Sequence, residues 1–196
     1  TALIVLVIFY TSFFIKMRLL KRQGINGNLL GKGEKPERAR LIEKILKAIT
    51  YGGACVQFAS LFLAGRIWEV DLPRIFMIIG VFLAALGTGF FIAAMMTMKN
   101  NWRSGCAIHQ NTRLVVGGLY KISRNPAFVG FDFLYLGWAL AYPNIFNLLV
   151  SISLIIIVHF QITEEESFLE SVFGAEYDNY KAGVNRYLGR KTIDVQ

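Results

Sequence analysis

Five apolar blocks dominate the sequence, and each approaches the length that a helix needs to cross a bilayer. They cover residues 2–20, 45–64, 73–98, 126–142 and 144–162. A hydrocarbon core about 30 Å thick requires about 20 mainly apolar residues per helix. A small soluble globule could not hide 55% hydrophobic residues gathered in such blocks. The blocks therefore predict an all-α integral membrane protein with five transmembrane helices, forming one domain over residues 1–196.

The positive charges lie between these blocks and alternate in number along the chain. Lys and Arg number ten from Lys16 to Lys47, two in 66–74, five in 99–124, none between the last two blocks and four after residue 162. Cytoplasmic connections of membrane proteins carry the Lys/Arg excess. We therefore expect a multi-pass protein with its N-terminus outside and its C-terminus in the cytoplasm. The net charge of +8 then reflects topology and contact with anionic lipid, so no nucleic-acid partner is expected.

The fourth and fifth blocks are separated only by Pro143 and Asn144, which predicts a tight helical hairpin. Beyond the hairpin, an apolar face that includes Phe168 and Phe173 ends at Gly174, and another begins at Tyr177. We expect this C-terminal amphipathic helical segment to lie on the membrane interface or to fold back over the hairpin. Two cysteines without paired spacing and two histidines indicate no metal site and no disulfide framework.

The residues at the beginning of the fourth block are typical of the start of a helix. Asn125 suits the N-cap position and Pro126 the first helical position. The free amide groups of a helix N-terminus attract anions, and the neighbouring Arg124 can hold a carboxylate with two hydrogen bonds. The pattern is typical of an anion site at the membrane surface. The alternative is a simple helix cap with Arg124 on a lipid phosphate.

The end of the fifth block carries three successive carboxylates, Glu164, Glu165 and Glu166. Negative charges at a helix C-terminus repel one another and oppose the helix dipole, so a cation is expected to compensate them. The alternative is a solvated acidic turn. Inside the blocks, Asp132 and His159 are the ionisable residues away from the ends, and such residues are functional candidates. Their offset of about five residues along the hairpin, roughly 7.5 Å, argues against direct pairing, and a purely structural hydrogen bond remains open for Asp132.

The polar sequence around the hairpin has a recognisable order. It contains Leu114-Val115, Gly118, Tyr120, Arg124-Asn125-Pro126, Phe128, Gly130, Glu165-Glu166, Leu169, Phe173-Gly174, Glu176-Tyr177, Tyr180 and Arg186. Together these residues resemble the isoprenylcysteine carboxyl methyltransferase family, in a short prokaryotic-type form, over residues 102–187. Residues 125–139 are also similar to phosphatidylethanolamine N-methyltransferases of the same wider group.

The resemblance implies an integral membrane enzyme that uses S-adenosylmethionine, with residues 102–187 as the cofactor-binding region. The implied cofactor contacts are Thr112, Arg113, Leu114, Val115, Tyr120, Asn125, Pro126, Ala127, Phe128, Glu165 and Glu166. The bound cofactor would then be the cation that the acidic run requires. Gln161 stands where the eukaryotic prenylcysteine enzymes carry an arginine assigned to substrate. Because a neutral side chain cannot neutralise a substrate carboxylate, a methyltransferase is predicted more firmly than a prenylcysteine acceptor.

We therefore expect methyl transfer to a lipophilic acceptor that enters from the membrane. In such a displacement the protein mainly aligns donor and acceptor. Arg124 is the candidate for orienting a carboxylate, and Asp132 or His159 the candidate for accepting a proton. Three alternatives remain open: a phospholipid amine N-methyltransferase, an NADPH-dependent membrane reductase, and a membrane scaffold without enzymatic activity.

Overall fold

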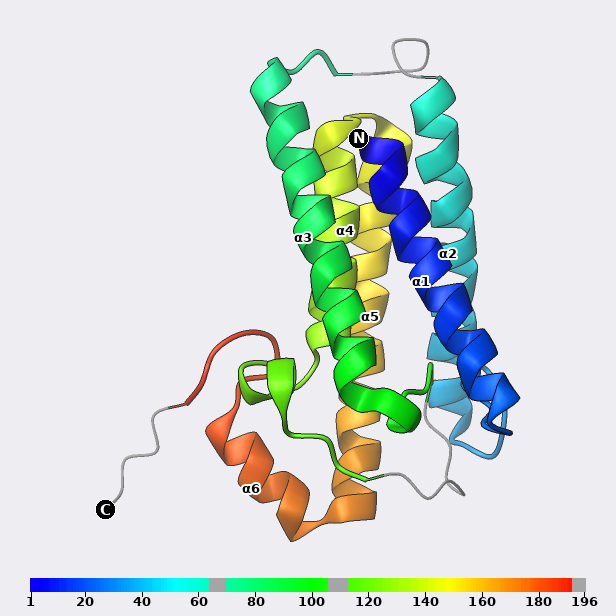
Figure 1. Cartoon of the computed structure of the whole chain (residues 1–196), viewed down its shortest axis with the longest axis vertical. Helices are drawn as coiled ribbons and strands as arrows, with labels where there is room; N and C mark the ends of the chain where they lie inside the picture. The colour runs from blue at the N-terminus through cyan, green and yellow to red at the C-terminus, as the bar shows by residue number, and fades with distance from the viewer. Residues whose placement is uncertain (64–69, 106–112, 192–196) are drawn as a thin grey trace.

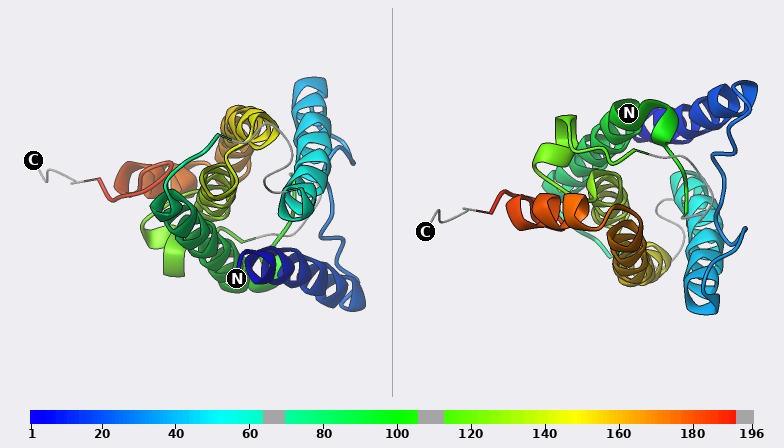
Figure 2. Two further views of the ribbon diagram at one scale, coloured as in Figure 1. Left: turned by 90° about the horizontal axis from the view of Figure 1, so that it is seen from above. Right: turned by 90° about the horizontal axis from the view of Figure 1, so that it is seen from below.

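The computed structural model describes residues 1–63, 70–105 and 113–191. The helices are α1 (Ala2–Arg22), α2 (Glu37–Phe62), α3 (Arg74–Met98), α4 (Pro126–Ala141), α5 (Ile145–Phe173) and α6 (Ala175–Gly183), with 3₁₀ turns η1 (Lys99–Asn101) and η2 (Gly118–Lys121). The helices α1, α3 and α5 run toward one end of a bundle, and α2 and α4 run back (Figure 1). Viewed along the bundle, α1 and α2 lie on one side of α3, α4 and α5 (Figure 2).

Among the described residues, α1, α2, α3 and α5 are long and apolar enough to cross a membrane. Helix α4 has 16 residues and rises about 24 Å, less than a bilayer core of about 30 Å. A fifth crossing therefore stays a prediction. Two helices extend beyond their apolar blocks. Helix α2 begins at Glu37, because charged residues that favour helix precede its apolar part, and α5 continues through the acidic run to Phe173.

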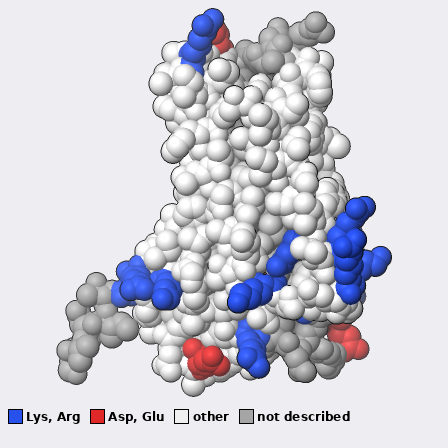
Figure 3. Space-filling model, in the orientation of Figure 1, with Lys and Arg blue, Asp and Glu red and all other residues white. Residues whose placement is uncertain are grey.

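Lys and Arg gather around the end of the bundle where α1, α3 and α5 finish (Figure 3). We call this the basic end, and it comprises residues 21–36, 99–105, 113–125 and 181–191. The middle of the visible face carries almost no charge (Figure 3). This separation of charge matches an apolar band flanked by a wetted, positively charged face.

Helices α3 and α4 pack with their backbones almost in contact. Gly80 and Gly87 of α3 face Gly137 and Gly130 of α4, and a Cβ built on Gly87 would lie 2.5 Å from the carbonyl oxygen of Gly130. Small residues permit this approach in apolar helix pairs. The close approach involves Gly87 but not Gly89, because a Cβ built on Gly89 would meet nothing within 4 Å.

The C-terminal part of the chain folds back on the start of α4. Helix α5 ends at Gly174, whose φ of 50° suits a glycine, and α6 turns alongside the bundle (Figure 1). Residues 184–191, here called the C-terminal segment, then cross the approach to α4. The Arg124 N–H donates to the Asn185 carbonyl at 3.0 Å, and the Gly189 N–H to the Ile122 carbonyl at 2.7 Å. Of the two placements expected for the tail, the C-terminal segment takes the one that folds back, onto the approach to α4.

Candidate functional site

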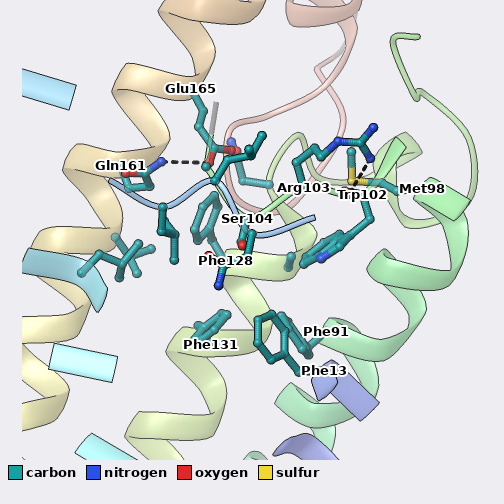
Figure 4. Close-up of a pocket in the computed structure, with 18 of the residues that line it drawn as sticks. Phe13, Phe91, Met98, Trp102, Arg103, Ser104, Phe128, Phe131, Gln161 and Glu165 are labelled. Carbon is teal, nitrogen blue, oxygen red and sulfur yellow. Dashed lines mark hydrogen bonds between the residues drawn. The ribbon is translucent and has the colours of Figure 1, made fainter. Parts of the chain in front are cut away.

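A cavity of about 520 Å³ lies inside the basic end of the bundle. All the long helices contribute to its wall, together with residues 101–105, 113–115 and η2. Glu165 and Gln161 lie toward one side of the cavity and the rings of Phe131, Phe91 and Phe13 toward another, with Ser104, Phe128 and Trp102 between them (Figure 4). The cavity therefore suits a ligand with a polar and an apolar part.

Aromatic rings from three helices form the inner wall of the cavity. Phe9 of α1 lies 4.7 Å from Phe91 of α3 between ring centroids, and 5.4 Å from Phe131 of α4. The rings of Phe91 and Phe131 are 5.1 Å apart and nearly perpendicular, at 83°. Such edge-to-face geometry stabilises aromatic pairs by about 0.5–1.5 kcal/mol. This wall is apolar and its rings are in contact.

The cavity opens sideways between α1 and α2. Helix α1 packs chiefly against α3, and α2 against α5. Phe14 of α1 and Tyr51 of α2 both line the cavity, yet 59% and 58% of their surfaces are exposed. A side chain can do both only at the mouth of the cavity. The Lys47 ammonium also lines it and lies 5.9 Å from the centroid of the Tyr51 ring, within the range of cation–π attraction.

The polar part of the wall contains buried groups that lack hydrogen-bond partners. Gln161 is 1% exposed, and its Nε2 donates to Glu165 Oε1 at 2.9 Å (Figure 4). Its Oε1 and the Trp102 Nε1 are both buried without a partner among the described residues. Because buried polar atoms are nearly always hydrogen-bonded, this acceptor and this donor fit a polar ligand in the cavity.

Behind this wall, Glu166 is held by three side chains. Arg124 Nη2 donates to its two carboxylate oxygens at 2.9 and 3.0 Å, and Arg186 Nε donates to Oε2 at 3.1 Å. Asn125 Nδ2 donates to Oε1 at 2.9 Å. These contacts join α4, α5 and the C-terminal segment. We call the four residues the Glu166 clamp.

The clamp corrects the expectation that a cofactor must supply the cation for the acidic run. Glu166 is paired with Arg124 and Arg186, and Glu164 with Arg38 at 3.1 Å. Residues distant in sequence thus compensate two of the three carboxylates. Glu165 is the carboxylate of the run that lines the cavity.

The start of α4 was predicted at the correct residue, but not with the correct contact. Asn125 is the N-cap and Pro126 the first residue of α4, yet the Asn125 side chain makes no capping hydrogen bond. Its amide group is turned instead toward the Glu166 carboxylate and the Arg186 carbonyl, because a hydrogen bond to an ionised acceptor is the stronger one. Asn125 thereby fixes the C-terminal segment beside the cavity.

Tyr120 contributes a neutral phenol to the cavity wall. Its backbone carbonyl accepts a hydrogen bond from Tyr180 Oη at 2.7 Å, which ties η2 to α6. Burial raises the pKa of the Tyr120 hydroxyl well above its ordinary value, and the nearby Glu165 raises it further. Burial likewise raises the pKa of Tyr180. Both hydroxyls therefore stay protonated at neutral pH.

Most of the site residues expected from the sequence meet at this cavity. Those that line it are Arg113, Leu114, Val115, Tyr120, Arg124, Asn125, Ala127, Phe128, Gln161 and Glu165. Pro126 and Glu166 adjoin the wall without lining the cavity. Thr112 falls outside the described residues.

The two ionisable residues expected inside the membrane lie elsewhere. Neither Asp132 nor His159 is among the described residues that line the cavity. His159 is exposed, its Nδ1 lies 2.6 Å from Tyr187 Oη, and the two rings are stacked. Asp132 Oδ1 is buried without a hydrogen-bond partner among the described residues. A role for either in proton transfer stays a prediction.

Sequence reasoning missed the aromatic wall and Trp102. One signal was present, since Phe9, Tyr10, Phe13 and Phe14 lie at helical spacing on one face of the first block. Trp102 and Arg103 follow α3 in an irregular segment, where periodicity carries no information. Their contact with the cavity depends on how the segment crosses the bundle.

Two comparisons with known proteins bear on this site. A 55-residue stretch of the chain is 47% identical to an uncharacterized protein of Haemophilus influenzae, covering 28% of this chain and 79% of that protein. The profile of the phospholipid methyltransferase family matches residues 75–176, just over half of the chain. This range contains α4, α5 and most of the polar cavity wall. The resemblance to the wider group of isoprenylcysteine and phospholipid methyltransferases is thereby confirmed, and the chain belongs to the phospholipid methyltransferase family.

Proposed function

We propose that the protein is a multi-pass membrane methyltransferase that transfers a methyl group from S-adenosylmethionine to a lipophilic acceptor. The observation that carries the proposal is the two-part cavity. Its polar wall holds unpartnered buried atoms at the basic end, and its aromatic wall is open between α1 and α2. A charged donor can therefore reach the cavity from water, and an apolar acceptor can reach the same cavity from lipid.

The polar wall offers the groups that the donor requires. S-adenosylmethionine supplies an activated methyl group on a sulfonium, with an amino group, a carboxylate, a ribose and an adenine ring as binding handles. Glu165 and the Gln161 Oε1 are acceptors for the amino group or the ribose hydroxyls. Arg113 is a cation for the carboxylate, and the Trp102 Nε1 and the Phe128 ring provide a donor and an apolar face for the base.

The residues of the chain then contribute alignment and exclusion of water rather than acid–base chemistry. Arg124 lines the cavity, but its guanidinium is committed to Glu166. We therefore assign Arg124 and Asn125 a positioning role. Together they hold α5 and the C-terminal segment at the distance that sets the width of the polar wall.

The acceptor enters from the bilayer through the opening between α1 and α2. In this arrangement α4 also crosses the membrane, as the fourth of five spans, α4 and α5 form the predicted hairpin, and the basic end faces the cytoplasm. A neutral Gln161 beside Glu165 favours a headgroup amine over a carboxylate as the methylated group. Phospholipid amine methylation is thus the more specific candidate, and isoprenylcysteine carboxyl methylation the second. Mass spectrometry of products from phosphatidylethanolamine and from a farnesylcysteine derivative distinguishes the two.

Donor binding should depend on Glu165 but not on its neighbour. Glu165→Gln removes the carboxylate of the cavity wall, and a charge-assisted hydrogen bond contributes about 1.5–3 kcal/mol. We expect S-adenosylhomocysteine to bind about ten- to hundredfold more weakly to this variant, measured by calorimetry on detergent-purified protein. Glu164→Gln is the matched control, because Glu164 pairs with Arg38 and does not line the cavity. Wild-type protein that binds NADPH instead would support a reductase, and one that binds neither would support a scaffold.

A bulky residue at the opening should separate acceptor entry from donor binding. Ala54 lines the cavity on α2, one turn from Tyr51. We expect Ala54→Trp to lower kcat/KM for a lipid acceptor at least tenfold while S-adenosylhomocysteine affinity stays unchanged. Cys55→Trp is the control, because Cys55 is exposed on the same helix and does not line the cavity. Equal activity of the two variants would exclude this route of entry.

A further inference from the structure

A buried ion pair outside the cavity holds the segments that cover its basic end. Glu43 of α2 and Lys35 of the α1–α2 connection are 1% and 3% exposed at their side chains. Glu43 Oε2 accepts hydrogen bonds from Lys35 Nζ and from the Gly31 N–H, each at 2.6 Å. Lys35 Nζ also donates to the Leu29 carbonyl at 3.1 Å. The pair thus fixes a connection that contains three glycines at positive φ.

The fixed connection pairs with the segment that follows α3. The Leu29 N–H donates to the Ser104 carbonyl at 2.9 Å, and the Ser104 N–H donates to the Gly27 carbonyl at 2.8 Å. Asn28 and Ser104 form an isolated parallel bridge. A Cβ built on Gly105 would lie 2.9 Å from Glu43 Oε1, so the second segment also rests on Glu43. We call residues 28–30 together with 104–105 the roof, because all five line the cavity.

We propose that the roof is the route by which the methyl donor and its product enter and leave, and that Lys35 and Glu43 form the latch that sets the rate of this exchange. This inference rests on the proposed function. S-adenosylmethionine and S-adenosylhomocysteine are charged and cannot pass through the lipid-facing opening between α1 and α2. The roof lines the cavity and belongs to the basic end, the face that would meet water. Its described contacts include the Lys35–Glu43 ion pair, backbone hydrogen bonds and the hydrogen bond from Ser104 Oγ to the Gly27 carbonyl, and none of its five residues lies in a helix.

The latch predicts a kinetic signature that general destabilisation does not give. Glu43→Gln keeps the size of the side chain but leaves the Lys35 charge without its counter-ion. We expect the association and dissociation rates of S-adenosylhomocysteine both to rise, by about tenfold, as followed by stopped-flow fluorescence. Hydrogen exchange of the Leu29, Gly31 and Ser104 amides should accelerate in parallel. Lys32→Met is the control, because Lys32 is exposed in the same connection.

A cross-link tests the roof without disturbing the latch. Neighbouring strands lie about 4.8 Å apart, which permits a disulfide between Asn28→Cys and Ser104→Cys in protein whose native cysteines are replaced by serine. Oxidation should slow both association and dissociation at least tenfold, and reduction should restore them. Unchanged rates in the oxidised protein, or unchanged amide exchange in Glu43→Gln, would overturn the proposal. Wild-type protein that binds no S-adenosylhomocysteine would refute the proposed function, and accelerated exchange in Glu43→Gln would still support the latch.

Discussion

Glu166→Leu is expected to destabilise the protein by about 3–5 kcal/mol, the cost of removing one partner from a buried ion pair. The Arg124 and Glu166 side chains are 6% and 8% exposed. Leucine would leave the Arg124 guanidinium buried without its carboxylate, and Asn125 and Arg186 would lose an acceptor in the same step. The contacts among α4, α5 and the C-terminal segment should therefore loosen together, and donor binding should be lost with them.

Thermal unfolding in detergent, read by circular dichroism, measures this effect. Glu170→Gln is the matched control, because Glu170 lies one turn further along α5 and pairs with Lys181 at an exposed position. An exposed ion pair contributes only about 0–1 kcal/mol, so this variant should melt close to the wild type. If both variants melted alike, the Glu166 clamp would have no special part in stability.

Gly87→Ala should be nearly as damaging, although it adds one methyl group. The new Cβ would lie 2.5 Å from the Gly130 carbonyl oxygen and 2.6 Å from the Leu134 nitrogen. These are backbone atoms and cannot turn aside as a side chain could. Overpacking of a tight contact typically costs about 1–3 kcal/mol, and we expect the upper part of this range because α3 and α4 must move apart along their length.

Gly89→Ala, two residues along the same helix, should have the opposite sign. Nothing lies within 4 Å of a Cβ at Gly89, and alanine favours a helix over glycine by up to about 1 kcal/mol. The difference between the two variants in thermal or denaturant unfolding isolates the packing contribution. Equal stability of the two variants would show that Gly87 is not needed for the close approach of α3 and α4.

The sequence predicted the helices well because lipid-crossing segments follow from local composition. The ends of α1, α3 and α4 agree with the apolar blocks within about two residues. Leu114, Asn125 and Glu165, which the family resemblance implies as cofactor contacts, line one cavity, and their contact with a cofactor stays a prediction. Where charged residues extend a helix beyond its apolar part, as before Leu46 in α2, hydropathy alone makes the helix too short.

What could not be predicted depends on contacts between distant parts of the chain. The ion pair between Arg124 and Glu166 forms only if Glu166 of α5 lies level with the start of α4. No local sequence pattern determines how far α5 is shifted along α4. The ion pair between Lys35 and Glu43 could not be predicted either. A connection that contains glycines and several charged residues can adopt many conformations with different ion pairs. The contact of Asn125 could not be predicted for the same reason. Its residue type and position indicate a helix cap, but in the folded chain its side chain donates to Glu166.

The unequal packing of the helices has a further consequence for how the protein would respond to its solvent. The pair α3–α4 is joined backbone to backbone, whereas α1 and α2 stand on opposite sides of an opening whose rim, at Phe14 and Tyr51, is largely exposed. In a bilayer, acyl chains would close that rim, so lipid is itself part of the wall of the reaction chamber. Chain length, unsaturation and lateral pressure of the surrounding membrane should then tune turnover without any lipid being a substrate, an influence that a detergent micelle cannot reproduce.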